Sequence, residues 1–201
     1  MLAAMARGFQ GLALKAFGAN DYKLTVTGAR AVTESFRRLS FQAGGLLEHH
    51  ESHPTQWIRL WIPNGDKVQQ RGYTLLNSDP VADTFDIDFA LHPGPAWTWA
   101  STASAGDVME ASVLGSKFGM PDPVPTEYLL FGDAASIPAI NTLLAEVGDA
   151  RLRAAAAELT TTADTYAWVA CDFGTTRNIV KSLKTIHGLP KNSIKATAYW
   201  K

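Results

Sequence analysis

The residues best suited to chemistry in this sequence form a short run, Arg71-Gly72-Tyr73-Thr74, inside a segment of strand composition. On a strand, Arg71 and Tyr73 project from one face, while Thr74 projects from the other and Gly72 leaves the backbone bare. Arginine binds phosphate through paired hydrogen bonds, tyrosine stacks on conjugated rings, and glycine admits a close backbone approach. The run therefore indicates a site for a planar, anionic cofactor. A surface arginine beside a core tyrosine is the alternative, and it stays open on these four residues alone.

Two later loops could complete such a site. Residues 92–100, His-Pro-Gly-Pro-Ala-Trp-Thr-Trp-Ala, follow a strand and are expected to lead into a short helix, whose free N–H groups could receive a pyrophosphate. The alternative is an ordinary Pro/Gly turn with two tryptophans packed at the domain boundary. Residues 114–118, Leu-Gly-Ser-Lys-Phe, form a loop that either meets phosphate or is simply a turn.

Other chemistries find less support. His49, His50 and His53 have the donor type for a divalent metal, but they lie among polar residues without helical periodicity, so no metal site is predicted. Cys171 is the single cysteine, which excludes an internal disulfide, and its place at the end of a buried strand predicts an inert core residue. Neither a Ser-His-Asp set nor a phosphate-binding loop stands out, so no catalytic side chain is predicted.

The first half of the chain has to position these residues on antiparallel β structure. Asn64-Gly65 between two strand-like runs predicts a tight hairpin, because both residues tolerate positive φ. Six short strands separated by turns suggest a barrel. The expected strands are residues 22–27, 35–42, 56–62, 68–76, 84–92 and 108–114.

The second half alternates strands and helices, which implies a parallel sheet with ligands at the carboxyl ends of its strands. A strand over 128–131 ends at Gly132-Asp133 and leads into a helix from Ser136, the expected N-cap, to about Val147. A strand over 166–170 precedes a second helix, and 194–200 is a final strand. The second helix is expected to bury Ile179, Val180, Leu183 and Ile186 and to stop at Gly188 and Pro190. The domain boundary is expected over 120–125.

Composition limits the class of protein. The chain has 201 residues, 46% of them hydrophobic, and 18 basic against 19 acidic groups, so it can bury a core and lacks the basic footprint of a nucleic-acid binder. The first eighteen residues look like a surface helix or arm, because Arg7 and Gln10 interrupt the apolar run that a secretory peptide needs. We expect a monomer in the cytoplasm. Residues 173–201 carry six basic groups and no acid, either as a solvated helix face or as an anion-binding surface.

Taken in order, these segments resemble the siderophore-interacting protein family, flavin-dependent ferric-siderophore reductases within the ferredoxin-NADP reductase-like group. The resemblance covers nearly the whole chain from about Gly8 and is strongest to the actinobacterial branch, which includes the reductase domain of mycobactin importers. The matching pieces are Arg71-Gly72-Tyr73-Thr74, Asp88-Phe89-Ala90-Leu91-His92 with Gly94-Pro95-Ala96 and Trp99-Ala100, Tyr128-Leu129-Leu130-Phe131-Gly132-Asp133, Ile137-Pro138-Ala139-Ile140, Tyr166-Ala167-Trp168-Val169-Ala170, and Ala198-Tyr199-Trp200-Lys201.

The resemblance implies an antiparallel six-stranded barrel that binds FAD, over residues 1–120 with an N-terminal helical arm. A shortened parallel-sheet α/β domain over 126–201 would follow and present NADH or NADPH. Together with the loop at 114–118, the expected cofactor-binding residues are Arg71, Tyr73, Thr74, His92, Gly94, Pro95, Ala96, Trp99, Gly115, Ser116, Gly132 and Asp133.

Three departures from the family pattern qualify this. Leu76 stands where many members carry a second arginine, and Trp97 stands where a small hydroxyl residue is usual. Only residues 149–164 separate the two strand-helix units, where the family places additional ones. Three strands are therefore expected in the second domain, and the alanine-rich 154–157 is expected to be helical. Such a domain has a weakened NAD(P)H site or none.

The expected function is reduction of a ferric siderophore, an anionic iron chelate, with electrons passing from NADH or NADPH through FAD to Fe(III) so that Fe(II) is released. Transient association with a membrane importer is expected as well. The uniformly basic end of the chain suggests four lysines that steer the anionic substrate: Lys181, Lys184, Lys195 and Lys201. The alternatives are a general flavin reductase or electron-transfer module, and a flavin-binding protein without a working NAD(P)H site.

Overall fold

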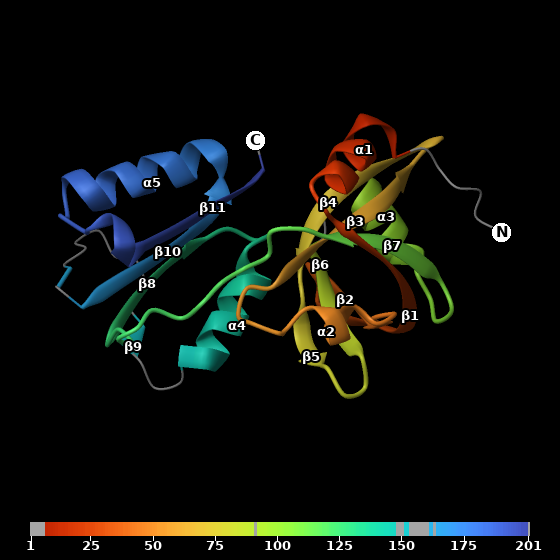
Figure 1. Cartoon of the computed structure of the whole chain (residues 1–201), viewed down its shortest axis with the longest axis horizontal. Helices are drawn as coiled ribbons and strands as arrows, with labels where there is room; N and C mark the ends of the chain where they lie inside the picture. Colours follow the sequence, from red (N-terminus) through yellow and green to blue (C-terminus); the bar gives the residue numbers. More distant parts are fainter. Residues whose placement is uncertain (1–6, 91, 148–150, 153–160, 163, 201) are drawn as a thin grey trace. The chain divides into compact units, whose positions relative to one another are not determined.

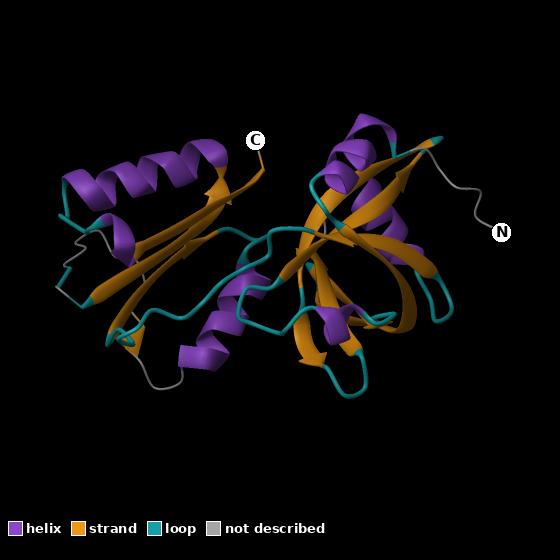
Figure 2. Cartoon of the chain, in the orientation of Figure 1, coloured by secondary structure: helices purple, strands orange, loops and turns teal. Residues whose placement is uncertain are grey.

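The computed structural model describes residues 7–90, 92–147, 151–152, 161–162 and 164–200, and the chain divides into two units, 1–118 and 119–201. Figures 1 and 2 show that strands dominate the first unit, whereas helices cover strands in the second.

The first unit is built on a seven-stranded antiparallel sheet of strand order β4-β3-β7-β1-β2-β6-β5. Its strands are β1 (Asn20–Thr33), β2 (Phe36–Gln42), β3 (Trp57–Asn64), β4 (Lys67–Thr74), β5 (Leu76–Asp79), β6 (Thr84–Ala90) and β7 (Val108–Val113). Its helices are α1 (Gly8–Ala16), α2 (Leu46–His49) and α3 (Pro95–Thr102). The predicted antiparallel β class is confirmed.

The sheet curls because its two edge strands are consecutive in the chain. β4 pairs with β3 as far as Thr74, the Leu75 N–H donates to the carbonyl of Gln56 (2.8 Å), and Leu76 already pairs with Asp86 of β6. The expectation of six strands is therefore wrong by one. Residues 76–79, expected as the end of the strand over 68–76 and the turn after it, form a separate strand, β5. The chain changes its pairing partner at Leu75.

The predicted β3–β4 hairpin is confirmed, but its turn lies one residue later than expected, because Asn64 belongs to β3. Asn64 pairs with Lys67, which leaves Gly65 and Asp66 as a two-residue turn, and Gly65 has a φ of +61° that suits glycine. Along β3 the side chains alternate, so that Ile58, Leu60 and Ile62 enter the core while the intervening residues face outward. This alternation places two arginine–tryptophan contacts on the outer face of the sheet.

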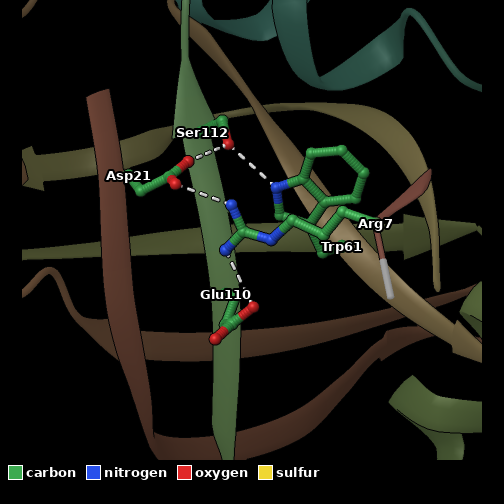
Figure 3. Close-up of polar contacts among 5 residues, drawn as sticks. All are labelled: Arg7, Asp21, Trp61, Glu110 and Ser112. Atoms are coloured by element: carbon green, nitrogen blue, oxygen red, sulfur yellow. Dashed lines mark hydrogen bonds and ion pairs between the residues drawn. The ribbon is translucent and has the colours of Figure 1, made fainter. Parts of the chain in front are cut away.

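One of these contacts fixes the N-terminal helix to the sheet (Figure 3). Arg7, immediately before α1, donates to Asp21 Oδ2 (2.7 Å) and Glu110 Oε2 (2.8 Å), and its guanidinium lies 4.9 Å from the ring centroid of Trp61. Trp61 Nε1 donates to Ser112 Oγ (2.8 Å), which donates in turn to Asp21. α1 is thus a surface helix anchored on the first unit.

The second unit has a four-stranded parallel sheet of order β11-β10-β8-β9, which confirms the predicted α/β class. Its strands are β8 (Glu127–Gly132), β9 (Arg151–Leu152), β10 (Thr165–Asp172) and β11 (Ile194–Trp200), and its helices are α4 (Ile137–Val147), α5 (Phe173–Thr185) and the short 3-10 helix η1 (Lys191–Ser193). Val169 of β10 and Leu183 of α5 belong to the same buried cluster, so α5 covers one face of the sheet.

Two expectations for this unit need correction. β9 supplies a fourth strand from within 149–164, so the expectation of three strands is wrong, while the expected helix at 154–157 lies outside the described residues. Ile186 is 75% exposed instead of buried, and it caps the helix one residue beyond the end of α5 at Thr185. At the other end of α5, Asp172 Oδ1 accepts from the Thr175 N–H (3.0 Å) and caps the helix.

None of the helices in the part of the chain that the structure describes is both long and apolar enough to cross a membrane.

Candidate functional site

Tyr73 lies where the two edges of the curled sheet meet. Its ring centroid is 4.5 Å from that of Phe89 on β6, and both rings pack with the core of the first unit. Burial raises the pKa of the Tyr73 phenol to about 12, against the opposing effect of the nearby Arg71 charge. The phenol is therefore neutral at physiological pH and presents a hydrogen-bond donor on a half-buried aromatic ring.

Arg71 is exposed two residues earlier on β4. Its guanidinium donates to neutral acceptors, the Gln70 carbonyl (2.9 Å) and Gln69 Oε1 (3.0 Å). Among the residues that the structure describes, no carboxylate pairs with Arg71. Its positive charge is therefore available to an anion, as the cofactor hypothesis requires. Thr74, on the opposite face, is buried.

The structure gives Gly72 a role that the sequence did not suggest. A Cβ at this position would lie 3.3 Å from Trp57 Cε3 and 3.6 Å from Cζ3, so a tryptophan ring covers the backbone expected to be bare. The guanidinium of Arg59 lies over the same Trp57 ring, 4.3 Å from its centroid. Gly72 thus makes room for a protein side chain, because Trp57 projects from the neighbouring strand beside it.

The loop before α3 and the start of that helix, the second expected part of the cofactor site, lie close to the β4 run. Gly94 has a φ of +153°, Pro95 occupies the first turn, and Trp99 packs 6.0 Å from the ring of Phe89. The short helix expected over this segment is confirmed, and Ala96 is buried beneath it. Phe89 therefore contacts the rings of both Tyr73 and Trp99 and joins the β4 run to α3.

The start of α3 supplies groups that suit an anion. His92 is exposed, and its Nδ1 approaches only the Pro93 carbonyl, at 3.3 Å. The N–H groups in the first turn of a helix lack intrahelical acceptors, so those of Ala96 and Trp97 suit an anion. The donor set of Arg71, Tyr73 and this turn fits FAD, which has a conjugated ring and a pyrophosphate.

The loop after β7 is tied to β3 by two hydrogen bonds and to the segment before β3 by His53. Arg59 Nη1 donates to the Leu114 carbonyl (2.7 Å), the Trp57 N–H donates to Ser116 Oγ (2.9 Å), and His53 Nε2 lies 3.2 Å from the Ser116 carbonyl. Between these anchors Gly115 has a φ of +74°, which glycine adopts without strain. The expected contact residues Gly115 and Ser116 thus lie in a loop whose position depends on β3.

Sequence reasoning missed Trp57 and Phe89 and gave Arg59 no role. The available signal for Arg59 was that it is the single charge in the apolar strand-like segment 56–62. No such signal marks Trp57, since its contact with Gly72 depends on strand register.

In the second unit, Gly132 and Asp133 lie at the carboxyl end of β8, where a parallel sheet binds ligands. A Cβ at Gly132 would collide with Ser136 Oγ and Ile140 Cδ1, so the turn into α4 needs glycine. Asp133 Oδ1 accepts from the N–H groups of Ala135 (3.0 Å) and Ser136 (3.2 Å). Asp133 Oδ2 is buried and has no partner among the described residues, so it is an unsatisfied hydrogen-bond acceptor.

Cys171 lies nearby at the end of β10. The thiol is 5% exposed, and burial raises its pKa, with further contributions from the charges of Asp133 and Asp172. A raised pKa keeps the thiol protonated and poorly nucleophilic. The structure therefore agrees with the predicted inert core residue.

Of the four lysines expected to steer the substrate, the three that the structure describes do not gather near Asp133. Lys181 and Lys184 lie in an open groove on the exposed face of α5, together with Arg177 and the 57% exposed Phe173. Lys195 pairs with Trp168 near the start of the parallel strands, whereas Asp133 follows the end of β8. Lys201 lies outside the described residues. These lysines could influence an anion near Asp133 only through their long-range field.

The histidine cluster is divided between two environments. His53 Nδ1 lies 2.8 Å from the Pro54 carbonyl, while His50 packs 5.7 Å from the ring of Tyr22, and burial and the charge of His49 lower its pKa. Within the described ranges, no three His, Cys, Asp or Glu side chains come close enough to hold a metal ion.

A curled antiparallel sheet followed by a parallel sheet covered by helices is the architecture of ferredoxin-reductase-like flavoproteins. The chain shares it with the ferredoxin reductase of carbazole 1,9a-dioxygenase, at a TM-score of 0.70 and 16% identity over 92% of this chain and 67% of that chain. It shares it more closely with the siderophore-interacting protein of Acinetobacter baumannii, at a TM-score of 0.74 and 16% identity over 90% of each chain. These likenesses establish the fold.

Two family models identify the chain more narrowly. Residues 53–113 match the siderophore-interacting FAD-binding domain, and residues 146–201 match the siderophore-interacting protein model. The chain belongs to the siderophore-interacting protein family.

Among curated proteins, the chain is 33% identical over 237 residues to the mycobactin import ATP-binding/permease protein IrtA of Mycolicibacterium smegmatis. That alignment covers 98% of this chain and 28% of the relative, so the chain spans less than a third of the length of the curated relatives it matches. Because 237 aligned positions exceed the 201 residues present here, the relative carries residues for which this chain has no counterpart.

Proposed function

We propose that this chain is an FAD-dependent reductase that passes electrons from NADH or NADPH to Fe(III) in a ferric siderophore. The observation that carries the proposal is that Arg71, with no carboxylate partner among the described residues, lies two residues before the half-buried Tyr73 on β4. Both residues are inside the segment that matches a siderophore-interacting FAD-binding domain. Family membership supports the substrate class.

The residues of the first unit would hold FAD. Arg71 would bind phosphate, Tyr73 would support the flavin ring, and the start of α3 at Gly94 would receive the pyrophosphate. The remaining proposed cofactor contacts in this unit are Thr74, His92, Pro95, Ala96, Trp99, Gly115 and Ser116. When bound, FAD supplies a ring that accepts a hydride and returns single electrons.

The residues of the second unit would receive the nicotinamide nucleotide. Gly132 allows the tight turn after β8, and the free Asp133 Oδ2 would accept a hydrogen bond from a ribose hydroxyl or an amide. No side chain needs to act as a nucleophile. Reduction itself releases the iron, because hard oxygen ligands hold Fe(III) more tightly than Fe(II).

The proposal includes the setting of the reaction. The basic groups at the end of the chain would raise the local concentration of an anionic ferric complex through their field. We further propose a cytoplasmic monomer that associates transiently with a membrane importer, which the similarity to an import permease supports.

The first experiment is an anaerobic visible spectrum of the chain reconstituted with FAD. NADH or NADPH should bleach the flavin, and ferric mycobactin should restore its absorbance. Ferric citrate tests whether reoxidation is specific to a siderophore, and free FMN as competitor tests for a general flavin reductase. A chain that binds no FAD contradicts the proposal, because every later electron-transfer step depends on bound FAD.

Arg71→Gln provides a matched test of the flavin site. The variant should raise the Kd for FAD at least about tenfold, since a charge-assisted hydrogen bond to phosphate is lost. Lys67→Gln removes a charge from the exposed start of the same strand and should leave the Kd unchanged. Equal Kd values for both variants would remove Arg71 from the site.

A flavin-binding protein without a working NAD(P)H site is the second candidate. Asp133 Oδ1 already accepts from the Ala135 and Ser136 N–H groups, which an incoming phosphate would otherwise use. The curated relative also carries residues that this chain lacks. Flavin that binds but is not bleached by either nucleotide would favour this candidate.

A further inference from the structure

A stack of side chains on the outer face of β3 connects the β4 run with the loop after β7. The ring of Trp57 covers Gly72, 3.3 Å from the position of a Cβ there, and the guanidinium of Arg59 lies 4.3 Å from the centroid of that ring. Arg59 pairs with Gly72 in the sheet, so the stack lies against the backbone between Arg71 and Tyr73, on the face opposite their side chains. Any shift of Trp57 would therefore change the packing against the backbone of β4 at Gly72.

The other end of the stack holds the loop. Arg59 Nη1 donates to the carbonyl of Leu114 (2.7 Å), and the Trp57 N–H donates to Ser116 Oγ (2.9 Å). These two bonds lie on either side of Gly115. Two of the contacts that fix this loop thus depend on Trp57 and Arg59, which lie on one face of a single strand.

In the part of the chain that the structure describes, the charge of Arg59 has no carboxylate partner. Burial lowers the pKa of its guanidinium. The other arginine–tryptophan contact on β3 differs, because Arg7 over Trp61 is neutralised by Asp21 and Glu110. Keeping a partly desolvated charge without a counter-ion costs stability. The contacts that offset this cost are the stack on Trp57 and the bond to the Leu114 carbonyl, so the charge of Arg59 depends on the same groups that hold the loop.

We propose that Arg59 and Trp57 are positioning residues, which hold the loop over Leu114, Gly115 and Ser116 in register with β4 so that both can contact FAD. This inference rests on the proposed function. The flat guanidinium suits the task, since it stacks on the indole ring and donates to a carbonyl at the same time. A loop fixed before the cofactor arrives loses less conformational entropy on binding.

The test measures the Kd for FAD by equilibrium titration of the full chain. Arg59→Gln removes the cation and should raise the Kd about tenfold, the cost of ordering about one loop residue on binding. Gly72→Ala should raise it as well, because the new methyl group would push Trp57 by a few tenths of an ångström. Arg59→Lys keeps the charge but not the flat stack, and should fall between Arg59→Gln and the wild type.

Arg7→Gln is the matched control, since it removes an arginine from a tryptophan of the same strand without touching the loop. It should lower the melting temperature and leave the Kd for FAD unchanged. Hydrogen exchange of the FAD-free chain gives a second readout, in which Arg59→Gln should speed exchange at the Trp57 amide, which donates to Ser116 Oγ, and Arg7→Gln should not.

The outcomes are distinguishable. A wild-type chain that does not bind FAD overturns the proposed function and this inference together. A wild type that binds FAD while Arg59→Gln keeps the same Kd overturns this inference alone. Equal weakening in Arg59→Gln and Arg7→Gln also overturns it, because the effect would then reflect stability and not the loop.

Discussion

The ring centroids of Tyr73 and Phe89 lie 4.5 Å apart, and this contact joins β4 to β6 across the two ends of the curled sheet. Phe89 also lies 6.0 Å from Trp99 of α3, so one buried ring supports both elements of the proposed flavin site. The geometry of that site should therefore depend on a core residue that no ligand would touch.

Replacing Phe89 tests this dependence. Phe89→Leu keeps most of the core volume and should cost less than about 1.5 kcal/mol of unfolding free energy, yet it should weaken FAD binding because Tyr73 and Trp99 lose their common support. Phe85→Leu is the control on the same strand, since Phe85 stacks on Phe41 within the core. Urea unfolding and FAD titration should show equal losses of stability and unequal losses of affinity. Equal affinities would contradict the supporting role of Phe89.

The sequence was sufficient for those parts of the fold that local patterns determine. Asn64-Gly65 marked the hairpin, and alternating strands and helices marked the parallel sheet. β5 was not predicted, because the change of pairing partner at Leu75 depends on tertiary structure and leaves no pattern in the local sequence. β9 escaped because a two-residue strand is too short for periodicity.

The candidate site shows the same division. Arg71 and Tyr73 were found because arginine commonly binds phosphate and tyrosine commonly stacks on conjugated rings. The structure places both on β4, with Tyr73 against Phe89. The stack of Trp57 on Gly72 could not be found, because it depends on the register between β3 and β4. Register is a property of two strands together, and composition within one strand does not determine it.

The Tyr73 phenol should make stability depend on alkaline pH. Its pKa rises from 10.0 to about 12 in the folded chain, so the folded state retains the proton where the unfolded state has lost it. The contribution is complete below pH 10 and is lost as the pH rises towards 12, by up to about 1.4 kcal/mol per pH unit. Urea unfolding of wild type and Tyr73→Phe should therefore diverge over this window. Parallel pH profiles would show that the phenol is not buried as described.

The two lysines of α5 should act on an anionic substrate through charge alone. A double variant, Lys181→Ala with Lys184→Ala, should raise KM for ferric mycobactin at low ionic strength, and the difference from wild type should shrink as salt is added. Since kcat reports steps after binding, it should not change. Lys15→Ala, which removes a cation from α1 in the first unit, provides the control. A difference that persists at high salt would indicate direct contact instead of steering.

Asp133 should distinguish the two candidate functions, because its two carboxylate oxygens do different work. Oδ1 closes the turn before α4 through the N–H groups of Ala135 and Ser136, whereas the buried Oδ2 has no partner among the described residues. In Asp133→Asn, the amide oxygen can keep the turn and the amide nitrogen replaces the free acceptor with a donor.

If a nicotinamide nucleotide donates to Oδ2, Asp133→Asn should slow flavin bleaching by NADH or NADPH about tenfold or more, because a buried acceptor for the ligand is lost. The Kd for FAD and the melting temperature should stay near those of wild type. Stopped-flow absorbance of the FAD-loaded chain measures the bleaching rate directly. An unchanged rate would show that Asp133 takes no part in nucleotide binding. The carboxylate would then serve only to shape the turn after β8.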